Sequence, residues 1–421
     1  MSLQERDKRH IWHPLTQHGI AAPPLGIVKA RGALLWDEEG RSYIDGIASW
    51  YTAMYGHCND AIADAVNHQM RQLDQVVFTG FTHEPAVRLA EKLIELLPDN
   101  QQKVFFNDNG STAVEAAIKM AIQYHANKGR RRDTLIAFED GFHGDTFGAM
   151  SVSGLSVYNG PFEDFFLKVI RIPVPQENTK EAVLAQLESL IEEHKCAAFV
   201  YEPLVQGAAG MKFHDAAGLE LLLQCCRKHD VLSIADEVMT GFGKTGKHFA
   251  SLHLETQPDI FCLSKSLTAG MLPMSVTTTT QEVFDAFLDT EIAKGFFHAH
   301  TYTANPLGCA AALAGIELLQ TPEIQDAIAR IERSHQLFSE KIKKHPKVAT
   351  TRTKGVIFAL EIDVDMARYG TLRDQLFEAF MNDGVFLRPL GNVVYILPPF
   401  VISTEQLNTI YESIERVLDL L

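Results

Sequence analysis

The stretch that decides the fold is VLSIADEVMTGFGKTG, residues 231–246. It begins as a short apolar run, reaches a carboxylate at Asp236 and continues into a glycine-rich loop. A second apolar run, residues 260–263, leads to Ser264 and Lys265. Short apolar runs of this length are typical of buried strands. If the two runs are neighbouring strands of one sheet, Asp236 and Lys265 emerge at the same edge.

The pairing of Asp236 with Lys265 has a specific chemical meaning. A lone aspartate or a lone lysine predicts nothing, because surface lysines far outnumber reactive ones. A fixed acid beside a partly buried amine, however, is what a pyridine-aldehyde cofactor requires. The amine forms a Schiff base with the aldehyde, and the acid pairs with the ring nitrogen. We therefore expect pyridoxal 5'-phosphate (PLP) at this sheet edge.

The chain around this stretch alternates between strand and helix patterns. Strands are expected at 103–106, 134–138, 167–172, 197–201, 231–235, 260–263 and 274–279, and helices near 111–126, 180–194, 215–229 and 306–319. This alternation predicts an α/β fold with a mostly parallel central sheet covered by helices on both faces. After residue 320 the pattern changes to a smaller α+β domain, with helices near 322–344 and 372–382.

Three parts of the chain follow from these patterns. Residues 1–58 are expected to form an N-terminal arm and a hairpin that joins the small domain. Residues 59–320 form the large PLP-binding domain, and residues 321–421 form the C-terminal small domain. In the arm, aromatic residues and Pro14 predict an ordered but irregular segment, whereas residues 33–45 have the pattern of a hairpin.

Gly110 and Ser111 lie between a predicted strand and a predicted helix. The glycine permits a close approach of the backbone, and the helix N-terminus offers free N–H groups, so the pair suits a phosphate. A simple helix cap is the alternative explanation. The chain has no P-loop signature.

Polar and aromatic residues follow the next strands. Phe142 is placed to cover a planar ring, although a packed phenylalanine in a glycine-rich loop is the alternative. His143 and Asp145 lack a suitably spaced third ligand, so we predict no metal site. Glu202 either orients the cofactor face or fixes a neighbouring loop.

Further candidates lie toward the C-terminus. Thr301, in a polar loop before a helix, is suited to donate to a phosphate. Arg388 can grip a carboxylate through two hydrogen bonds, and a surface ion pair is its alternative role. Trp50 and Tyr395 either line an apolar tunnel or pack in the core.

The overall composition limits the possible partners and compartments. The chain has 421 residues, 46% hydrophobic and 22% charged, and a net charge of −15. Such a charge argues against nucleic acid, which binds basic surfaces. Six cysteines without metal spacing, a charged N-terminus and the lack of a long apolar run predict a cytoplasmic protein that does not bind membranes.

Together these motifs resemble the class III aminotransferases of PLP fold type I, over nearly the whole chain. The resemblance is most specific in residues 234–246 with Ser264 and Lys265. Within the class, three segments are similar to the aminotransferases of biotin biosynthesis: residues 9–14, residues 141–151, and residues 388–391 with Tyr395. The arm discriminates most, since other ω-aminotransferases do not share it.

This resemblance implies a homodimeric aminotransferase and gives roles to matching residues. Lys265 would hold PLP and move the reacting proton, and Asp236 would keep the ring nitrogen protonated. Phe142 would stack on the ring. Other cofactor contacts are implied for Gly110, Ser111, Glu202, His300 and Thr301, the last two from the partner subunit. Substrate contacts are implied for Leu15, Trp50, Phe142, Lys265, Ala299, Arg388 and Tyr395.

The implied reaction converts 8-amino-7-oxononanoate to 7,8-diaminononanoate by a ping-pong route. S-adenosylmethionine is the first candidate donor and lysine the second. Leu15, Phe142 and His300 depart from the usual family pattern, and Leu15 and His300 leave the donor open. Two alternatives remain: an ω-aminotransferase acting on lysine, ornithine or another amine, and a protein of the same fold without catalytic activity.

Overall fold

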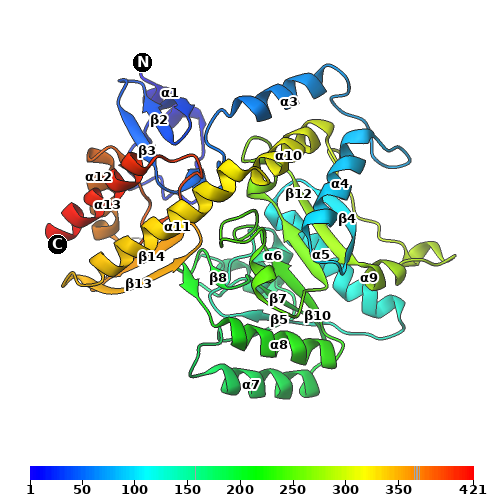
Figure 1. Ribbon diagram of the computed structural model, residues 1–421. Helices are drawn as coiled ribbons and strands as arrows, with labels where there is room; N and C mark the ends of the chain where they lie inside the picture. Colours follow the sequence, from blue (N-terminus) through cyan, green and yellow to red (C-terminus); the bar gives the residue numbers. More distant parts are fainter. Residues whose placement is uncertain (157, 365, 367, 369) are drawn as a thin grey trace.

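The computed structural model describes residues 1–156, 158–364, 366, 368 and 370–421. Among these residues, the largest sheet has seven strands in the order β4-β12-β11-β10-β7-β5-β6 (Figure 1). Their bounds are β4 Gln101–Asn107, β5 Thr134–Phe138, β6 Val169–Ile172, β7 Cys196–Tyr201, β10 Leu232–Asp236, β11 Ile260–Leu263 and β12 Ser275–Thr280. The strands predicted from the sequence are therefore present, with ends shifted by one or two residues.

The sheet is mostly parallel, as predicted. β10 pairs in parallel with β7 and with β11, and β5 pairs in parallel with β6 and β7. Among the described strands of this sheet, only β12 runs in the opposite direction, antiparallel to its neighbours β11 and β4. Asp236 pairs with Cys262 in the register of β10 and β11, so Lys265 leaves the sheet at the same edge. The strand argument made from the sequence is thus confirmed.

Two apolar layers form on the two faces of this sheet, because successive side chains of a strand point to opposite faces. Ile234 packs in a cluster with residues of α5 (Gly110–Asn127). Ala235 belongs to a larger cluster that includes residues of α8 (Ala216–Lys228). α7 (Lys180–Glu193) packs on α8, and both lie below the sheet in Figure 1. Helices on both faces leave the ends of the strands as the accessible edge of the sheet.

Further helices complete the layer structure. α4 (Glu84–Leu96) packs on β4, and α10 (Pro306–Leu319) packs on α3 (Asp60–Met70) and α4. Two short helices, α6 (Phe147–Val152) and α9 (Gln281–Asp285), lie beside α5. A small two-stranded sheet joins β8 (Val205–Gln206) and β9 (Lys212–Phe213).

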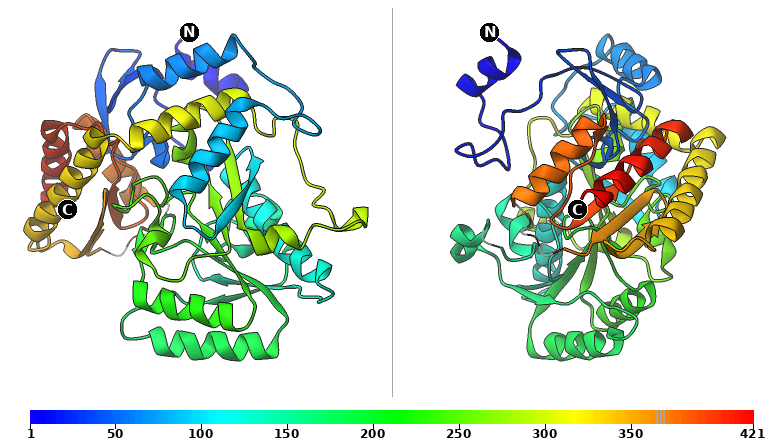
Figure 2. Two further views of the ribbon diagram at one scale, coloured as in Figure 1. Left: turned by 45° about the vertical axis from the view of Figure 1, so that its right-hand side comes forward. Right: turned by 90° about the vertical axis from the view of Figure 1, so that its left-hand side faces the viewer.

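The two chain ends meet in a second region. β1 (Ile27–Arg31), β2 (Leu34–Asp37) and β3 (Ser42–Asp45) form an antiparallel meander, and β15 (Val385–Phe386) joins β3 in parallel. β13 (Val348–Lys354), β14 (Ile357–Ile362) and β16 (Val393–Ile396) form a separate sheet. α11 (Pro322–Ile342) packs on β13 and β14, whereas α12 (Thr371–Asn382) and α13 (Thr404–Asp419) pack on β15 (Figure 2). The hairpin thus pairs with the C-terminal part, whereas the predicted domain boundaries stay a prediction.

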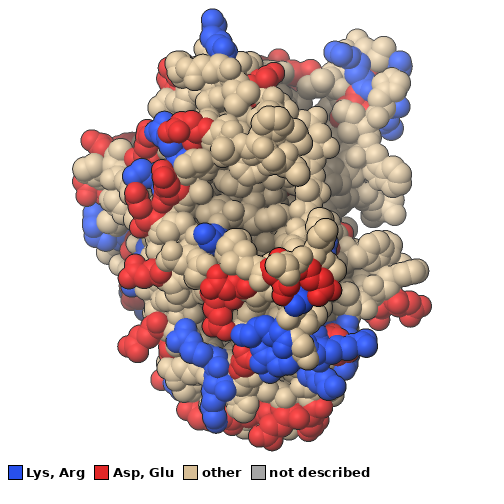
Figure 3. Space-filling view, turned by 90° about the vertical axis from the view of Figure 1, so that its right-hand side faces the viewer, with Lys and Arg blue, Asp and Glu red and all other residues tan. Residues whose placement is uncertain are grey.

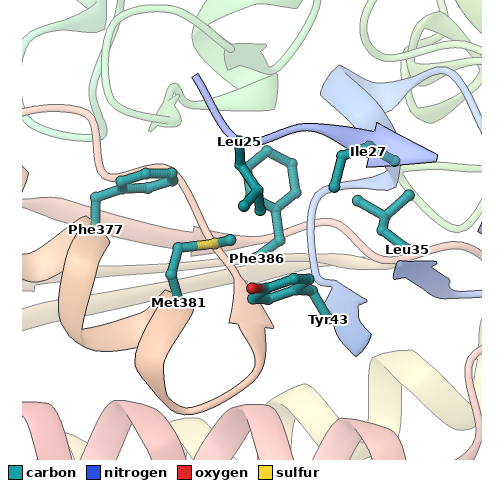
Figure 4. A pocket seen from close by; sticks show the side chains of 7 residues that line it. All are labelled: Leu25, Ile27, Leu35, Tyr43, Phe377, Met381 and Phe386. Carbon is teal, nitrogen blue, oxygen red and sulfur yellow. The ribbon is translucent and has the colours of Figure 1, made fainter. Parts of the chain in front are cut away.

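A small apolar cavity of about 240 Å³ lies where β1, β2, β3 and β15 meet α12 (Figure 4). Its walls are Leu25, Ile27, Leu35, Tyr43, Phe377, Met381 and Phe386. It is a gap between packed elements and does not include any predicted site residue.

The N-terminal arm contains structure that the sequence analysis did not predict. α1 (Leu3–His10) has a capping box at Ser2 and Glu5, yet none of its residues is buried. The N–H of its first residue, Leu3, donates to the Glu38 side chain at 3.2 Å, and the helix projects from the edge of the molecule in Figure 2. β1 and β13 were also not predicted. In the described part of the chain, no helix combines the length and apolar character needed to cross a membrane.

Candidate active site

Asp236 is the last residue of β10 and is 4% exposed. One carboxylate oxygen accepts from the Val238 N–H at 3.0 Å, and the other lies 2.8 Å from Nδ1 of His143. Burial opposes the charge on His143, but the hydrogen bond and the charge of Asp236 together raise the pKa of His143. The sequence analysis considered His143 only as a metal ligand and missed this contact. Its position in the loop after β5 was the available signal.

Lys265 follows β11 and begins a 3-10 turn, Lys265–Thr268, with a positive φ of 50°. Its side chain is partly buried, and its Nζ lies 5.3 Å from the centre of the Tyr51 ring. No hydrogen bond joins this amine to another described residue. Burial lowers the pKa of Lys265, while Asp236 and Glu202 act in the opposite direction. A lower pKa leaves more of the amine uncharged and able to act as a nucleophile.

A second lysine, Lys244, is completely buried close to the first. Its Nζ donates to the Gly241 carbonyl at 3.0 Å and to Oγ of Ser266 at 2.6 Å. Burial lowers the pKa of Lys244 well below its ordinary value, and the charge of Lys265 adds to the effect. The sequence analysis gave Lys244 no role. Its loop has the glycine spacing G-x-G-x-x-G but leads into a 3-10 turn, not into an α-helix.

Gly110 and Ser111 are the first two residues of α5, as the sequence predicted. The cap is Asn109, whose side chain accepts from Thr112 N–H at 3.1 Å. No hydrogen bond to a described residue occupies the N–H groups of Gly110 and Ser111. A β-carbon at Gly110 would lie 2.9 Å from Val238, so only glycine fits there. The helix cap and the free N–H groups therefore occur together, and these N–H groups can hold a phosphate.

Phe142 and Glu202 meet at the ends of β5 and β7. The Phe142 side chain is 45% exposed, which leaves its ring available to a planar group. Glu202 accepts from the N–H groups of Phe142 at 3.0 Å and Gly207 at 2.9 Å. Burial raises the pKa of Glu202 to about 7, against the effect of His143. Glu202 thus fixes two loops of the site.

Trp50 and Arg388 come from distant parts of the chain and lie together. The guanidinium carbon of Arg388 is 5.1 Å from the centre of the Trp50 ring. Trp50 is 39% exposed, and Arg388 is partly buried. Arg388 forms no ion pair with a described acidic residue, which speaks against its alternative role. Tyr395 is 1% exposed and packs 5.7 Å from Tyr51, in line with core packing.

Other predicted residues do not join this group within one chain. Leu15 is 59% exposed in the arm, and Ala299 is exposed. The Thr301 carbonyl accepts from Gln75 at 2.8 Å, and the main contact of His300 is with Thr303. None of the described contacts joins His300 or Thr301 to Gly110 or Ser111.

The residues present fit PLP. The amine of Lys265 has no hydrogen-bond partner among the described residues, a buried acid ends the neighbouring strand, and free N–H groups lie at the start of α5. The half-exposed ring of Phe142 supplies a stacking surface. None of these features is specific by itself, but all four are placed by one sheet edge.

Comparison with known proteins agrees with this geometry. The family model "Aminotransferase class-III" matches residues 16–418. The chain is 42% identical to the adenosylmethionine-8-amino-7-oxononanoate aminotransferase of Synechococcus elongatus, over 97% of this chain and 98% of that protein. It is 38% identical to the protein of the same name from Geobacter sulfurreducens, over 99% of this chain and 97% of that protein.

Solved structures show the same fold over the full length. The adenosylmethionine-8-amino-7-oxononanoate aminotransferase of Methanocaldococcus jannaschii superposes with a TM-score of 0.93 at 32% identity, covering 99% of this chain and 98% of that one. An omega transaminase of Pseudomonas jessenii, in complex with PMP, superposes with a TM-score of 0.92 at 28% identity. The match covers 100% of this chain and 98% of that one. The fold is thus that of the PLP-dependent enzymes of fold type I, and the cofactor is PLP. The chain is a PLP-dependent transaminase that acts on a keto acid and an amino donor, and it belongs to the class III aminotransferases.

Proposed function

We propose that this enzyme transfers an amino group onto 8-amino-7-oxononanoate and so forms 7,8-diaminononanoate in biotin biosynthesis. The names of its full-length relatives support this. The fold alone does not separate this activity from a general omega transaminase, because the TM-scores are 0.93 and 0.92. Sequence identity separates the two activities better. The chain is 42% identical to the Synechococcus elongatus relative and 28% identical to the Pseudomonas jessenii omega transaminase.

The observation that carries the proposal is the pairing of Arg388 with Trp50. A partly buried guanidinium without an acidic partner is ready to bind a carboxylate through two hydrogen bonds. The Trp50 ring beside it offers an apolar wall. A keto acid with one carboxylate on a long apolar chain matches both groups.

The chain's own residues supply binding and proton transfer. PLP, when bound, supplies the electron sink. The Lys265 amine holds the cofactor. It then carries the proton between Cα of the substrate and C4′ of the cofactor. Asp236 keeps the ring nitrogen protonated, and His143 holds Asp236 in place. Gly110 and Ser111 bind the phosphate, Phe142 covers the ring, and Glu202 fixes the Phe142 loop.

The donor and the acceptor use the same pocket in turn. The donor leaves its amino group on the cofactor and departs as a keto compound before the acceptor enters. S-adenosylmethionine is the first candidate donor. Lysine is the second candidate. Leu15, in the exposed arm, lacks the polar group that the family usually has at this substrate-contacting position, and such a change can alter which donor is accepted.

We also propose that two copies form each site and that the enzyme works in the cytoplasm. Trp12 and Ile20 in the arm are 90% and 87% exposed, so this segment is available to pack on a second copy. One face also shows a broad area without charged side chains (Figure 3). In this arrangement His300, Thr301 and Ala299 reach the site from the partner subunit. All six cysteines are free, which fits a reducing compartment.

The test is an assay of the purified protein with 8-amino-7-oxononanoate and a panel of donors. The panel includes S-adenosylmethionine, lysine and ornithine, and formation of 7,8-diaminononanoate is followed by mass spectrometry. Turnover with one donor identifies both substrates together. If no donor supports turnover but other keto acids are aminated, the enzyme is instead a general ω-aminotransferase.

A further inference from the structure

Residues 48–51 form a left-handed helical turn. The φ angles of Ala48, Ser49, Trp50 and Tyr51 are 46°, 46°, 69° and 71°. The Tyr51 N–H donates to the Ile47 carbonyl at 2.9 Å, which closes the turn. Residues other than glycine visit this region singly, because the β-carbon approaches the following carbonyl oxygen. Four in succession persist only where surrounding contacts hold them, and such strain gathers at functional sites.

The beginning of the turn is held by Asp45, the last residue of β3. Asp45 is completely buried. Its carboxylate accepts from the N–H groups of Ile47 at 3.1 Å and Ser49 at 2.8 Å, and from the Ser49 hydroxyl at 3.0 Å. Nε2 of His57 lies 2.8 Å from the same carboxylate. One carboxylate therefore gathers the polar groups that would otherwise let the turn unwind.

The end of the turn is tied to the segment that carries the reactive lysine. The Ser266 hydroxyl donates to the Tyr51 carbonyl at 3.1 Å and accepts from Lys244 at 2.6 Å. Ser266 directly follows Lys265 in the chain. The backbone of the turn and the backbone of the lysine are thus fixed to each other.

The left-handed path decides where two neighbouring side chains point. Trp50 lies against the Arg388 guanidinium at 5.1 Å, and Tyr51 lies against the Lys265 amine at 5.3 Å. Both rings face a cation of the site although they are consecutive residues. A right-handed or extended path through residues 48–51 would turn at least one of them away.

We propose that the left-handed turn at residues 48–51 is a positioning element of the reaction and that Asp45 is the positioning residue that holds it. The turn aligns the Trp50 wall with Arg388 and the Tyr51 ring with Lys265 before a substrate arrives. This inference rests on the proposed function only where it takes Arg388 as the residue that binds the substrate carboxylate. Asp45 does not touch a substrate and acts through Ile47 and Ser49.

The test compares Asp45→Asn with Asp37→Asn in the PLP-loaded enzyme. Asp37 is a matched control, because it is a buried carboxylate at the end of β2 that accepts from Arg41 and Tyr43 and has no contact with the site. Both variants should lower the melting temperature. Only Asp45→Asn should raise the KM for the keto acid, by about tenfold, since small misplacements weaken productive binding.

A second measurement follows the absorbance of the bound cofactor against pH, without any substrate. Asp45→Asn should shift the midpoint by about half a pH unit, because Tyr51 moves relative to Lys265. Asp37→Asn should leave it in place. Loss of activity in Asp45→Asn with an unchanged KM and an unchanged midpoint would assign Asp45 a structural role only and overturn the proposal.

Milder variants keep the test usable if Asp45→Asn does not fold. Ser49→Ala deletes one hydroxyl from the carboxylate and should raise the same KM by about twofold to fivefold. In the Asp45→Asn background, Ala48→Gly should restore part of the lost binding, because glycine adopts positive φ without strain. An unchanged KM in Ser49→Ala would contradict the proposal.

The outcomes for the turn and for the proposed function are distinguishable. The wild type and each variant are compared with one keto acid that the wild type accepts. Failure of the wild type with 8-amino-7-oxononanoate counts against the proposed acceptor alone. The absorbance midpoint needs no acceptor, so it tests the turn in either case.

Discussion

The cofactor side and the substrate side of this site are built in different ways. Asp236, Lys265 and Phe142 follow strands of one sheet, and Gly110 begins the helix after another. On the substrate side, Trp50 and Arg388 come from the two ends of the chain and meet across the second region of the fold. The first side depends on regular hydrogen-bonded strands, whereas the second depends on a strained turn and on contacts between distant segments.

The difference predicts how the two sides respond to change. A substitution on the cofactor side removes a chemical group but leaves the sheet intact, so it should lower kcat. A substitution on the substrate side alters how a carboxylate is held, so it should act mainly on KM. The following experiments test this division, starting with the largest expected effect.

Lys265→Ala removes the amine that we propose holds the cofactor and moves the proton. We expect the rate of amino transfer to fall by at least about 10³-fold. The purified variant should also lose the yellow colour that borohydride bleaches. The control is Lys168→Ala, a lysine that is 58% exposed and paired with Asp133. Colour that persists in Lys265→Ala and is still bleached would show that another lysine, such as Lys244, holds the cofactor.

Asp236→Asn removes the negative charge that we propose keeps the ring nitrogen protonated. We expect kcat to fall by about 10²- to 10³-fold, with a smaller change in KM. Asp259→Asn is the control, since Asp259 accepts from the Ser233 N–H and hydroxyl, both at 2.8 Å, near the other end of the same strands. A loss of folding without a specific loss of kcat in Asp236→Asn would place Asp236 with the structural carboxylates.

Arg388→Ala tests the substrate side. Removing a charged hydrogen-bonding partner costs about 1.5–3 kcal/mol, which corresponds to a rise of about 10- to 100-fold in the KM for the keto acid. kcat should change less. Arg416→Ala, at an arginine paired with Asp383 on the surface, should leave both constants unchanged. A fall in kcat with an unchanged KM would break the division between the two sides.

Glu202→Gln concerns stability against pH. The pKa of Glu202 is raised from 4.5 to about 7, so the folded state holds a proton between these values that the unfolded state has lost. The contribution of Glu202 to stability is therefore present at low pH and falls as pH rises through this window, by at most about 1.4 kcal/mol per pH unit.

Urea unfolding of the cofactor-free protein at several pH values measures this contribution. The difference in unfolding free energy between the wild type and Glu202→Gln should decline from about pH 5 to pH 7. Buried histidines without an electrostatic interaction with Glu202, such as His335, contribute equally to both proteins and cancel. The charge of Glu202 also acts to raise the pKa of His143 and of Lys265, so these two groups form part of the measured difference. A difference that does not vary with pH would mean that Glu202 is ionised throughout.

Much of the fold was predictable because its signals are local. The apolar runs from 134–138 to 274–279 and the helices between them occur close to their predicted positions. Ser403 caps α13 through a capping box with Gln406, a motif that is visible in the sequence at residues 403–406. α1 was missed because it is exposed and has no apolar face, and β13 because its residues are mostly polar. Neither has the periodic burial on which sequence patterns depend.

The sequence by itself determined the sheet, the edge that carries Asp236 and Lys265, and the start of α5 at Gly110. These follow from short-range patterns, since a strand's end and a helix's first turn are set by neighbouring residues. Only the tertiary structure decided that His143 holds Asp236, that Lys244 is buried beside Lys265, and that residues 48–51 take a left-handed path. Such features arise from contacts between segments far apart in the chain, and a strained backbone is retained only where those contacts outweigh its local preference.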